Sequence, residues 1–420
     1  MTAISPITAM SLIIPINLDG FDLRRLPAGF TDNPYPWYAA LRRQSPVRRM
    51  PDGSLFLTRY RDIEFVYKNP KIFSSDKKQE FLPKFGLSPL YAHHTTSLVF
   101  NDPPLHTRVR KILMGALTPK AIGQMEASLV QLVDRLLDQL AVDARGGTAV
   151  DLISGFATAI PVEVIGNLLG VPHNERGPLR DWSLAILGAL EPSLSETQLQ
   201  RGNTAVAEFL AYLQSLVAER RAALGDPQTD VLTRLILGEG GTGELLSEEE
   251  LLQNCIFILN AGHETTTNLI GNALVTLQEW PQELHRLLAE PLAIDDAIEE
   301  VLRFESSNQL GNRRALEDTR LSNTDIPSGT LITLCIGAAN RDPEVFEAPE
   351  EFRIHRPHQR HLAFGSGIHL CAGMSLARLE GRIALGRFLA RFPGYRLAAP
   401  PIRGGRVRFR GFQSIPAFLA

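Results

Sequence analysis

The chain has 420 residues, of which 44% are hydrophobic and 21% are charged, and its formal net charge at pH 7 is −3. This length allows one large domain or two to three ordinary ones. The near-neutral balance lacks the basic footprint of a nucleic-acid-binding protein and the acidic tail of an interaction module, so we expect no nucleic-acid partner.

Residues 1–30 show no regular pattern, and we treat them as an irregular segment ahead of a single domain over 31–420. Their apolar run, between Ala9 and Leu18, is broken by Pro15 and follows no Lys or Arg. A spanning helix needs roughly 20 apolar residues, and a signal peptide needs a basic start. We therefore expect no membrane segment and a cytoplasmic protein.

The next patterns are a helix over Pro36–Ser45 and two short strands, 47–50 and 54–58, around a Pro-Asp-Gly turn. Between Lys77 and Leu98, apolar, proline and glycine residues follow no period. So long an irregular stretch in a compact domain is usually functional, which predicts a substrate-facing loop. The alternative is a mobile surface insertion.

Asn101-Asp102-Pro103-Pro104 is predicted to start a helix, with Asp102 as its N-cap and proline at its first position. Within it, His106 and Arg110 are four residues apart and share one face. Further helical patterns fill 119–141, 159–170, 176–190, 197–223 and 228–237.

Residues 238–243 spell G-x-G-x-x-G. A dinucleotide-binding loop needs a strand before this motif and a helix opening on its last glycine. Here a helical pattern precedes it and the next helix starts later, so we predict an ordinary loop.

The longest helical pattern runs from Ser247 to about Trp280, with Ser247 and Glu250 forming a capping box. It contains Gly262 and three consecutive threonines, which are poor helix formers. We expect a central helix that bends, with a threonine hydroxyl bonded to a freed carbonyl. Glu264 and Thr265 form either a polar stripe or an acid–alcohol pair facing a reaction centre.

Another helix is predicted over Asp295–Phe304, with Glu300 and Arg303 on one face. Strand patterns follow at 314–321 and 330–336. The C-terminal 403–420 reads as a hairpin with Phe412 near its tip.

The chain has three cysteines. Cys255 and Cys335 lie in apolar runs typical of the core, and the odd count and wide spacing argue against a disulfide framework. Cys371 instead ends the glycine-rich loop His361–Gly373 and opens a helix, where the dipole and free N–H groups favour a thiolate. Such a cysteine can bind a metal through one bond. The helix is predicted to run from Ala372 to about Phe392. We expect Gly367 to let the backbone fold back towards the sulfur, and Gly373 to let a flat ligand or an amide approach it closely.

Phe364-x-x-Gly367-x-x-x-Cys371-x-Gly373 resembles the haem-binding loop of the cytochrome P450 family, in which the cysteine thiolate binds the haem iron. The run 261–266, Ala-Gly-His-Glu-Thr-Thr, resembles the family's oxygen-activation segment. Glu300-x-x-Arg303 together with Arg356 resembles its buried structural ion network. These motifs stand in the family's order.

The resemblance implies a mainly α (α+β) fold, with a large helical lobe and a smaller β-rich lobe around a buried haem b (iron protoporphyrin IX). Cys371 matches the metal ligand, and Glu264 and Thr265 match the residues that relay protons and hydrogen-bond dioxygen. The other residues implied in haem binding are His106, Arg110, Arg313, His369, Phe364, Gly367 and Gly373.

The implied activity is a monooxygenase that inserts one atom of dioxygen into a hydrophobic small organic substrate. We expect a monomer whose electrons come from a separate ferredoxin or flavodoxin with its reductase. Docking of that partner is assigned to Arg108, Lys111 and Arg378. The candidates for an apolar substrate pocket are Phe81, Leu82, Phe85, Leu259, Ala261, Leu310 and Phe412.

Three alternatives remain. A zinc site could use Cys371 with neighbouring histidines, although no C-x-x-C or H-E-x-x-H motif accompanies them. A haem-thiolate peroxygenase or a haem-based sensor would keep Cys371 but would not need the Glu264–Thr265 pair. The zinc histidines would be His355, His358, His361 and His369.

Overall fold

The computed structural model describes residues 16–227, 230–238 and 245–420. Most of the apolar run at Ala9–Leu18 and most of the G-x-G-x-x-G stretch lie outside these residues. Within the described ranges, no helix is long and apolar enough to cross a membrane.

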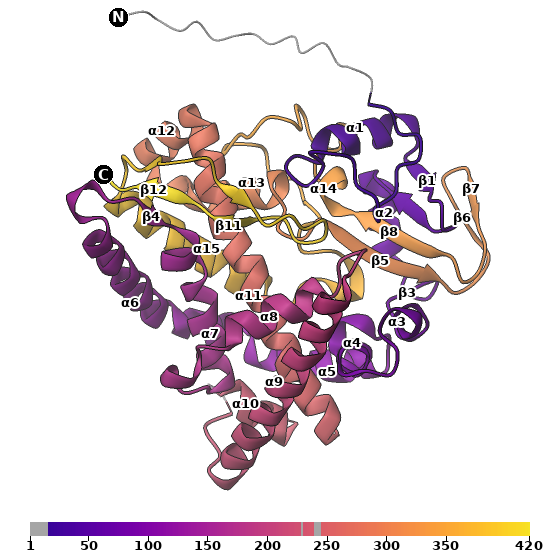
Figure 1. Ribbon diagram of the computed structural model, residues 1–420, viewed down its shortest axis with the longest axis horizontal. Coiled ribbons are helices and arrows are strands. Elements are labelled where there is room, and N and C mark those ends of the chain that lie inside the picture. Colours follow the sequence, from indigo (N-terminus) through magenta and orange to yellow (C-terminus); the bar gives the residue numbers. More distant parts are fainter. Residues whose placement is uncertain (1–15, 228–229, 239–244) are drawn as a thin grey trace, which may run out of the picture.

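Helices make up most of the molecule, and one long helix, α11, runs through their middle (Figure 1). It packs against α7, α8, α9 and α15, which come from distant parts of the sequence. The helices of this lobe are α5 (Leu105–Ala116), α6 (Pro119–Asp143), α7 (Ala159–Leu169), α8 (Leu179–Gly188), α9 (Glu196–Ala222), α10 (Val231–Leu237), α11 (Glu248–Glu279), α12 (Pro281–Ala289), α13 (Ile294–Phe304) and α15 (Met374–Arg391).

The predicted capping box of α11 is confirmed. Ser247 Oγ accepts from the backbone N–H of Glu250, at 3.1 Å, and the Glu250 side chain accepts from the backbone N–H of Ser247, at 2.9 Å. These bonds satisfy two donors that a helix start otherwise leaves open.

A smaller lobe contains a five-stranded sheet in the order β1-β2-β8-β5-β3. Strands β2 and β8 are parallel and the other pairs are antiparallel. Its elements are α1 (Tyr35–Gln44), β1 (Val47–Arg49), β2 (Leu55–Leu57), α2 (Tyr60–Lys68), β3 (Phe73–Ser74), β5 (Leu310–Ala315), β6 (Thr319–Leu321), β7 (Thr324–Ile326), β8 (Leu331–Cys335) and α14 (Ile336–Ala339). The expected division into a helical and a β-rich lobe is confirmed.

The predicted loop over 77–98 is wrong, because this stretch forms α3 (Lys78–Phe85) and α4 (Pro89–Thr96). Ser88 caps α4 by accepting from the N–H of Tyr91, at 3.3 Å, and Pro89 occupies the first turn. Helix α4 packs against both α9 and α11, so it buries residues on more than one face and loses the period of an amphipathic helix.

Asp102 does not cap α5, whose N-cap position is taken by Pro104. Its carboxylate instead accepts from the N–H of Ser75, at 2.9 Å, and from the hydroxyl of Ser74. Asp102 therefore ties the end of β3 to the start of α5.

The predicted C-terminal hairpin is only partly correct. Strand β11 (Phe412–Ser414) pairs with β10 (Ile402–Arg403), and Phe412 lies opposite Arg403 rather than at the tip. Strand β12 (Pro416–Phe418) joins β4 (Val150–Asp151) and β9 (Arg396–Leu397) in a separate sheet.

The predicted ion network is confirmed. Arg303 donates through Nε and Nη2 to the two oxygens of Glu300, both at 2.7 Å, and Arg356 Nε reaches them at 3.1 Å. Arg303 also donates to the carbonyls of Asn340, Pro349 and Glu351. The network thus fastens α13 to the segment that leads into the Cys371 loop.

We expect Glu300→Ala to lower the free energy of unfolding by about 3 kcal/mol, because it leaves two buried guanidinium groups without their carboxylate. Urea unfolding followed by tryptophan fluorescence measures the change. The control is Asp325→Ala, which removes an exposed carboxylate facing Arg320 and should cost less than about 0.5 kcal/mol. Equal losses in the two variants would contradict a structural role for Glu300.

Candidate functional site

The loop before α15 holds Cys371 in place through its backbone. The N–H of Cys371 donates to the carbonyl of Phe364 at 2.9 Å, and Gly365 and Gly367 both have φ of 68°. A Cβ added to Gly367 would lie 2.1 Å from the carbonyl oxygen of Tyr67. Only glycine permits this approach, which agrees with the prediction that Gly367 lets the backbone turn.

Helix α15 begins at Met374 rather than at Ala372, so Cys371 lies just before it. Burial raises the pKa of the Cys371 thiol, and the N–H of Gly373 and the guanidinium groups of Arg110 and Arg378 lower it. A thiol that coordinates a metal cation is deprotonated outright. The surroundings of the sulfur therefore suit a thiolate whose charge a bound metal balances.

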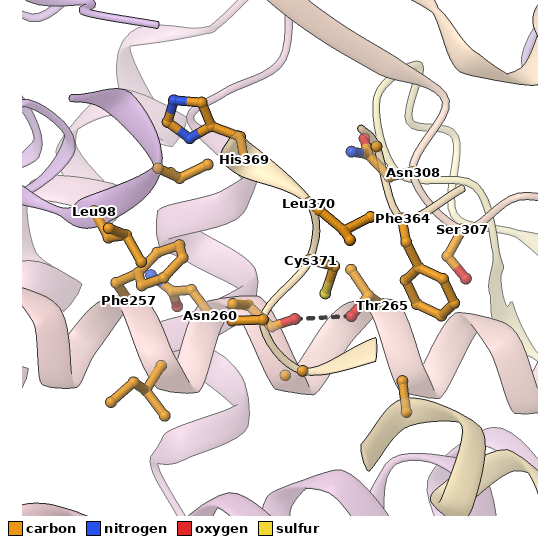
Figure 2. Close-up of a pocket in the computed structure, with 18 of the residues that line it drawn as sticks. Leu98, Phe257, Asn260, Thr265, Ser307, Asn308, Phe364, His369, Leu370 and Cys371 are labelled. Atoms are coloured by element: carbon orange, nitrogen blue, oxygen red, sulfur yellow. Dashed lines mark hydrogen bonds between the residues drawn. The ribbon is translucent and has the colours of Figure 1, made fainter. Parts of the chain in front are cut away.

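Cys371 faces a cavity of about 370 Å³. Its walls come from α4, α5, α7, α11, β5 and the Cys371 loop, and Figure 2 shows the Cys371 sulfur and the Thr265 side chain around it. A Cβ on Gly373, which also lines this cavity, would meet nothing within 4 Å. The wall beside the sulfur thus leaves room for a flat ligand, as predicted for Gly373.

Four predicted haem-binding residues line the same cavity: His106, Arg110, Arg313 and His369. Both ring nitrogens of His106 and the Nε2 of His369 are buried without a hydrogen-bond partner. Burial lowers the pKa of His106 to about 4 and that of His369 to about 2, with further lowering by the adjacent arginines.

Within the part of the chain that the structure describes, the guanidinium groups of Arg110 and Arg313 also lack a partner of opposite charge. Arg110 donates to the carbonyl of Leu370 at 2.6 Å and Arg313 to that of Asn312 at 2.7 Å, and among the described residues neither has a carboxylate within 4.0 Å. Buried polar groups are normally paired. Two ligand carboxylates, such as the propionates of a porphyrin, would satisfy these donors, so the residues present fit the predicted group.

Thr265 lines the cavity from α11, and its hydroxyl donates to the carbonyl of Ala261 at 2.8 Å. This is the predicted bond from a threonine to a helix carbonyl. The helix is unbroken across the segment. Close packing explains the glycine at position 262, because a Cβ there would lie 2.5 Å from the Ile165 side chain of α7.

Glu264 does not line the cavity with Thr265. Its two carboxylate oxygens accept from Arg406, at 2.6 and 2.7 Å, and Arg406 also donates to the carbonyl of Leu184. Burial raises the pKa of Glu264 to about 7, against the lowering effect of Arg406. The expectation that both side chains face one reaction centre is therefore wrong in this structure.

Of the predicted substrate residues, the cavity wall includes only Ala261 and Leu310. Leu82 is 46% exposed, since it lies on the outer side of α3. The side chains packed into the apolar core instead are Phe81, Phe85, Leu259 and Phe412. In place of Phe412, the C-terminal segment contributes Phe409 and Arg408.

The predicted docking residues lie on two helices, Arg108 and Lys111 on α5 and Arg378 on α15. Arg108 is ion-paired with Glu250. Arg378 donates to both oxygens of Glu299, at 2.6 and 2.8 Å. Pairing reduces the net positive charge that these arginines present to a partner.

The geometry contradicts the zinc alternative. His355, His358 and His361 each face a carboxylate, at 3.0, 3.3 and 3.2 Å, and not Cys371. In the described part of the chain, no cluster of three or more histidine, cysteine or acidic side chains could hold a metal ion.

Sequence reasoning missed Glu380, which lines the cavity from α15. It is buried, its Oε2 has no partner, and burial raises its pKa to about 8. The available signal was a single acid within the buried stripe that contains Leu376, Leu379 and Ile383.

Known proteins are similar to this chain in sequence and in fold. The family described as Cytochrome P450 matches residues 183–394. The chain is 38% identical to Cytochrome P450 107B1 of Saccharopolyspora erythraea, over 94% of this chain and 97% of that one. It is 36% identical to the Vitamin D(3) 25-hydroxylase of Pseudonocardia autotrophica, over 88% and 89%. The crystal structure of P450BioI with hexadec-9Z-enoic acid ligated acyl carrier protein matches with a TM-score of 0.86 and 32% identity, over 93% and 99%.

We expect the stability of the protein to depend on the charge of Glu264. Its carboxyl has a pKa of about 7 when folded, against an ordinary value of 4.5, so the folded state binds more protons between these pH values. The free energy of unfolding should therefore fall with rising pH across this window by about 3 kcal/mol more in the wild type than in Glu264→Gln.

Arg406→Ala should extend that fall above pH 7, because removing the cation raises the pKa of Glu264 further. Chemical unfolding over a pH series measures both effects. Arg387→Ala, which removes the exposed partner of Asp134, is the control and should follow the wild type. The same pH dependence in the wild type and in Glu264→Gln would show that Glu264 does not titrate in this range.

Proposed function

Since this chain belongs to the cytochrome P450 family, it is a haem-thiolate monooxygenase that acts on a small organic substrate, and we propose which of its residues carry each part of that activity. The observation that carries the assignment is the position of Cys371, on a glycine-rich loop at the wall of a cavity that Thr265 also lines. When bound, the haem supplies the iron at which dioxygen is reduced, one oxygen atom entering the substrate and the other leaving as water.

In this proposal Cys371 binds the iron as a thiolate, and His106, Arg110, Arg313 and His369 bind the two propionates. We assign the non-covalent haem b form because the sequence contains no C-x-x-C-H attachment motif. Cys255 and Cys335 are buried in the core, where burial raises the pKa of each to about 12. Neither is suited to bond to a haem side chain.

Thr265 is proposed to hydrogen-bond dioxygen, and its position among the residues that line the cavity supports this role. Glu264 is proposed to exchange protons with that site. A group with a pKa of about 7 gains and loses a proton readily near neutral pH. Its carboxylate must leave Arg406 or act through intervening water, since it does not line the cavity.

The substrate is proposed to be a hydrophobic small molecule. Most of the cavity wall is apolar, with Leu113, Ile165, Leu187 and Phe257 among its residues. One similar protein is named Vitamin D(3) 25-hydroxylase, and the similar structure of P450BioI contains an acyl carrier protein ligated to hexadec-9Z-enoic acid. Both compounds are lipid-like. We further propose that the protein is a monomer in the cytoplasm with a single domain over 31–420. Its electrons would come from a ferredoxin or flavodoxin.

The ferrous protein with carbon monoxide should show the absorption maximum of a thiolate-ligated carbonyl complex. Cys371→His should retain haem and lose that maximum, because an imidazole replaces the thiolate donor. Cys255→Ala removes a core thiol and should keep the spectrum of the wild type. Folded, pigmented wild-type protein without this maximum would overturn the assignment of Cys371.

Partner docking can be tested at Arg378. We expect Arg378→Glu to raise the apparent Michaelis constant for a reduced ferredoxin about threefold at low ionic strength, with a smaller effect at high salt. Initial rates at varied ferredoxin concentration measure this.

Arg391→Glu is the matched control, because Arg391 lies at the other end of α15 and also pairs with a carboxylate, that of Asp138. It should leave the constant unchanged. Equal values for wild type and Arg378→Glu would remove Arg378 from the docking surface.

A further inference from the structure

Arg408 is a cation in the wall of the cavity. It lies between β10 and β11, and its backbone is fixed because its carbonyl accepts from the N–H of Gln309 at 2.8 Å. The wall around it is mostly apolar. A guanidinium group in such a place needs either a carboxylate partner or a ligand.

The hydrogen bonds of Arg408 go to neutral oxygens. It donates to the carbonyl of Leu310 at 2.9 Å, to Oδ1 of Asn312 at 2.5 Å, and weakly to the carbonyl of Leu190 at 3.4 Å. Among the described residues no carboxylate lies within 4.0 Å of its guanidinium, and burial lowers its pKa. The charge therefore lacks a direct counter-ion.

A second cation lies near it. Lys84 donates to the backbone carbonyl of Glu191 at 2.7 Å and, within the described ranges, has no carboxylate within salt-bridge distance. Its pKa is lowered to about 8, first by burial and then by the positive charge of Arg408. Lys84 does not line the cavity, but its positive charge adds to that of Arg408 and favours an anion bound at Arg408.

The nearby carboxylates are already engaged. Glu80 binds Lys77 at 2.6 Å. Glu191 accepts from the backbone N–H groups of Val407, at 2.9 Å, and Arg408, at 3.2 Å. These two acids face three cations, Lys77, Lys84 and Arg408, so the group keeps one positive charge in excess.

An unpartnered histidine lies on the same side of the cavity. His94 is 2% exposed, lines the cavity, and has no partner for its Nε2. Burial lowers its pKa well below the usual value, and His93, Lys84 and Arg408 lower it further. The neutral imidazole is therefore a further group on the cavity wall that can donate to an oxyanion.

We propose that Arg408, assisted by Lys84, binds an anionic headgroup of the substrate, a carboxylate or a phosphate monoester, while the hydrophobic remainder extends toward Cys371 and Thr265. The inference rests on the proposed use of this cavity as the substrate site. It narrows the substrate class to amphiphilic anions with an apolar chain or ring system. The headgroup then fixes which carbon reaches the reacting side of the cavity.

Ligands anchored at one end test this proposal. Imidazole would bind the haem iron and shift the Soret band to the red. In a series of ω-(imidazol-1-yl)alkanoic acids the imidazole end is held at the iron, so longer chains place the carboxylate at increasing distances from it. Each acid is compared with its methyl ester, which has a similar shape and no charge, and with the phosphate monoester of the same length.

In the wild type, at one or more chain lengths, the acid or the phosphate should bind about tenfold more tightly than the ester, the size of a charge-assisted hydrogen bond. Arg408→Gln should remove this preference, and Arg408→Lys should retain most of it. The carboxylate and phosphate arms tell which oxyanion the site prefers. Butylimidazole, which carries no headgroup, should bind all three proteins equally.

Arg320→Gln controls for net charge, because it removes an exposed cation far from the cavity wall, and it should keep the preference. If Arg408→Gln does not fold, Lys84→Gln should lower the preference about threefold. No preference at any length in the wild type, or a preference that survives Arg408→Gln, overturns the proposal. The carbonyl spectrum is measured in the same samples, so a failed haem-thiolate assignment is recognised separately.

Discussion

Close packing around Tyr67 holds the Cys371 loop, strand β5 and a cationic side chain against one another. A Cβ on Gly367 would lie 2.1 Å from the Tyr67 carbonyl oxygen, and one on Gly311 would lie 2.5 Å from its hydroxyl. The guanidinium of Arg313 lies over the same ring, 5.1 Å from its centroid. Glycine at positions 367 and 311 permits these two close approaches to Tyr67. The positions of the Cys371 sulfur and of Arg313, which is proposed to bind a propionate, therefore depend on this tyrosine.

Two sets of buried polar groups in this protein differ in how completely they are hydrogen-bonded. Those of the Glu300 network are fully bonded, to one another and to backbone carbonyls, as expected where the role is structural. Around the cavity, His106, His369 and Glu380 keep buried atoms without partners, and Arg408 has only neutral ones. Buried polar groups are normally paired, so the unpaired groups on the cavity wall are available to a ligand.

The features that sequence predicts well here are local. The capping box at Ser247 depends on residues a few positions apart, and the turn at Gly367 uses a positive φ that glycine adopts readily; both are found. The helices over 77–98 were missed because α4 is buried on more than one face, which removes the periodic signal. Arg408 was missed because its partners Leu310 and Asn312 lie about a hundred positions away in the sequence.

The pair Glu264–Thr265 shows why a motif can be located without its geometry. Consecutive helical residues point about 100° apart, and in this stretch Thr265 and Thr266 face the cavity while Glu264 points to its other side. Thr265 lines the cavity, and Glu264 accepts from Arg406, which lies 142 positions later in the sequence. Burial raises the pKa of this carboxyl and Arg406 lowers it, and the balance near 7 leaves a proton easy to exchange at neutral pH. The segment after β10 therefore contributes two arginines to the site: Arg406 pairs with Glu264, and Arg408 lines the cavity.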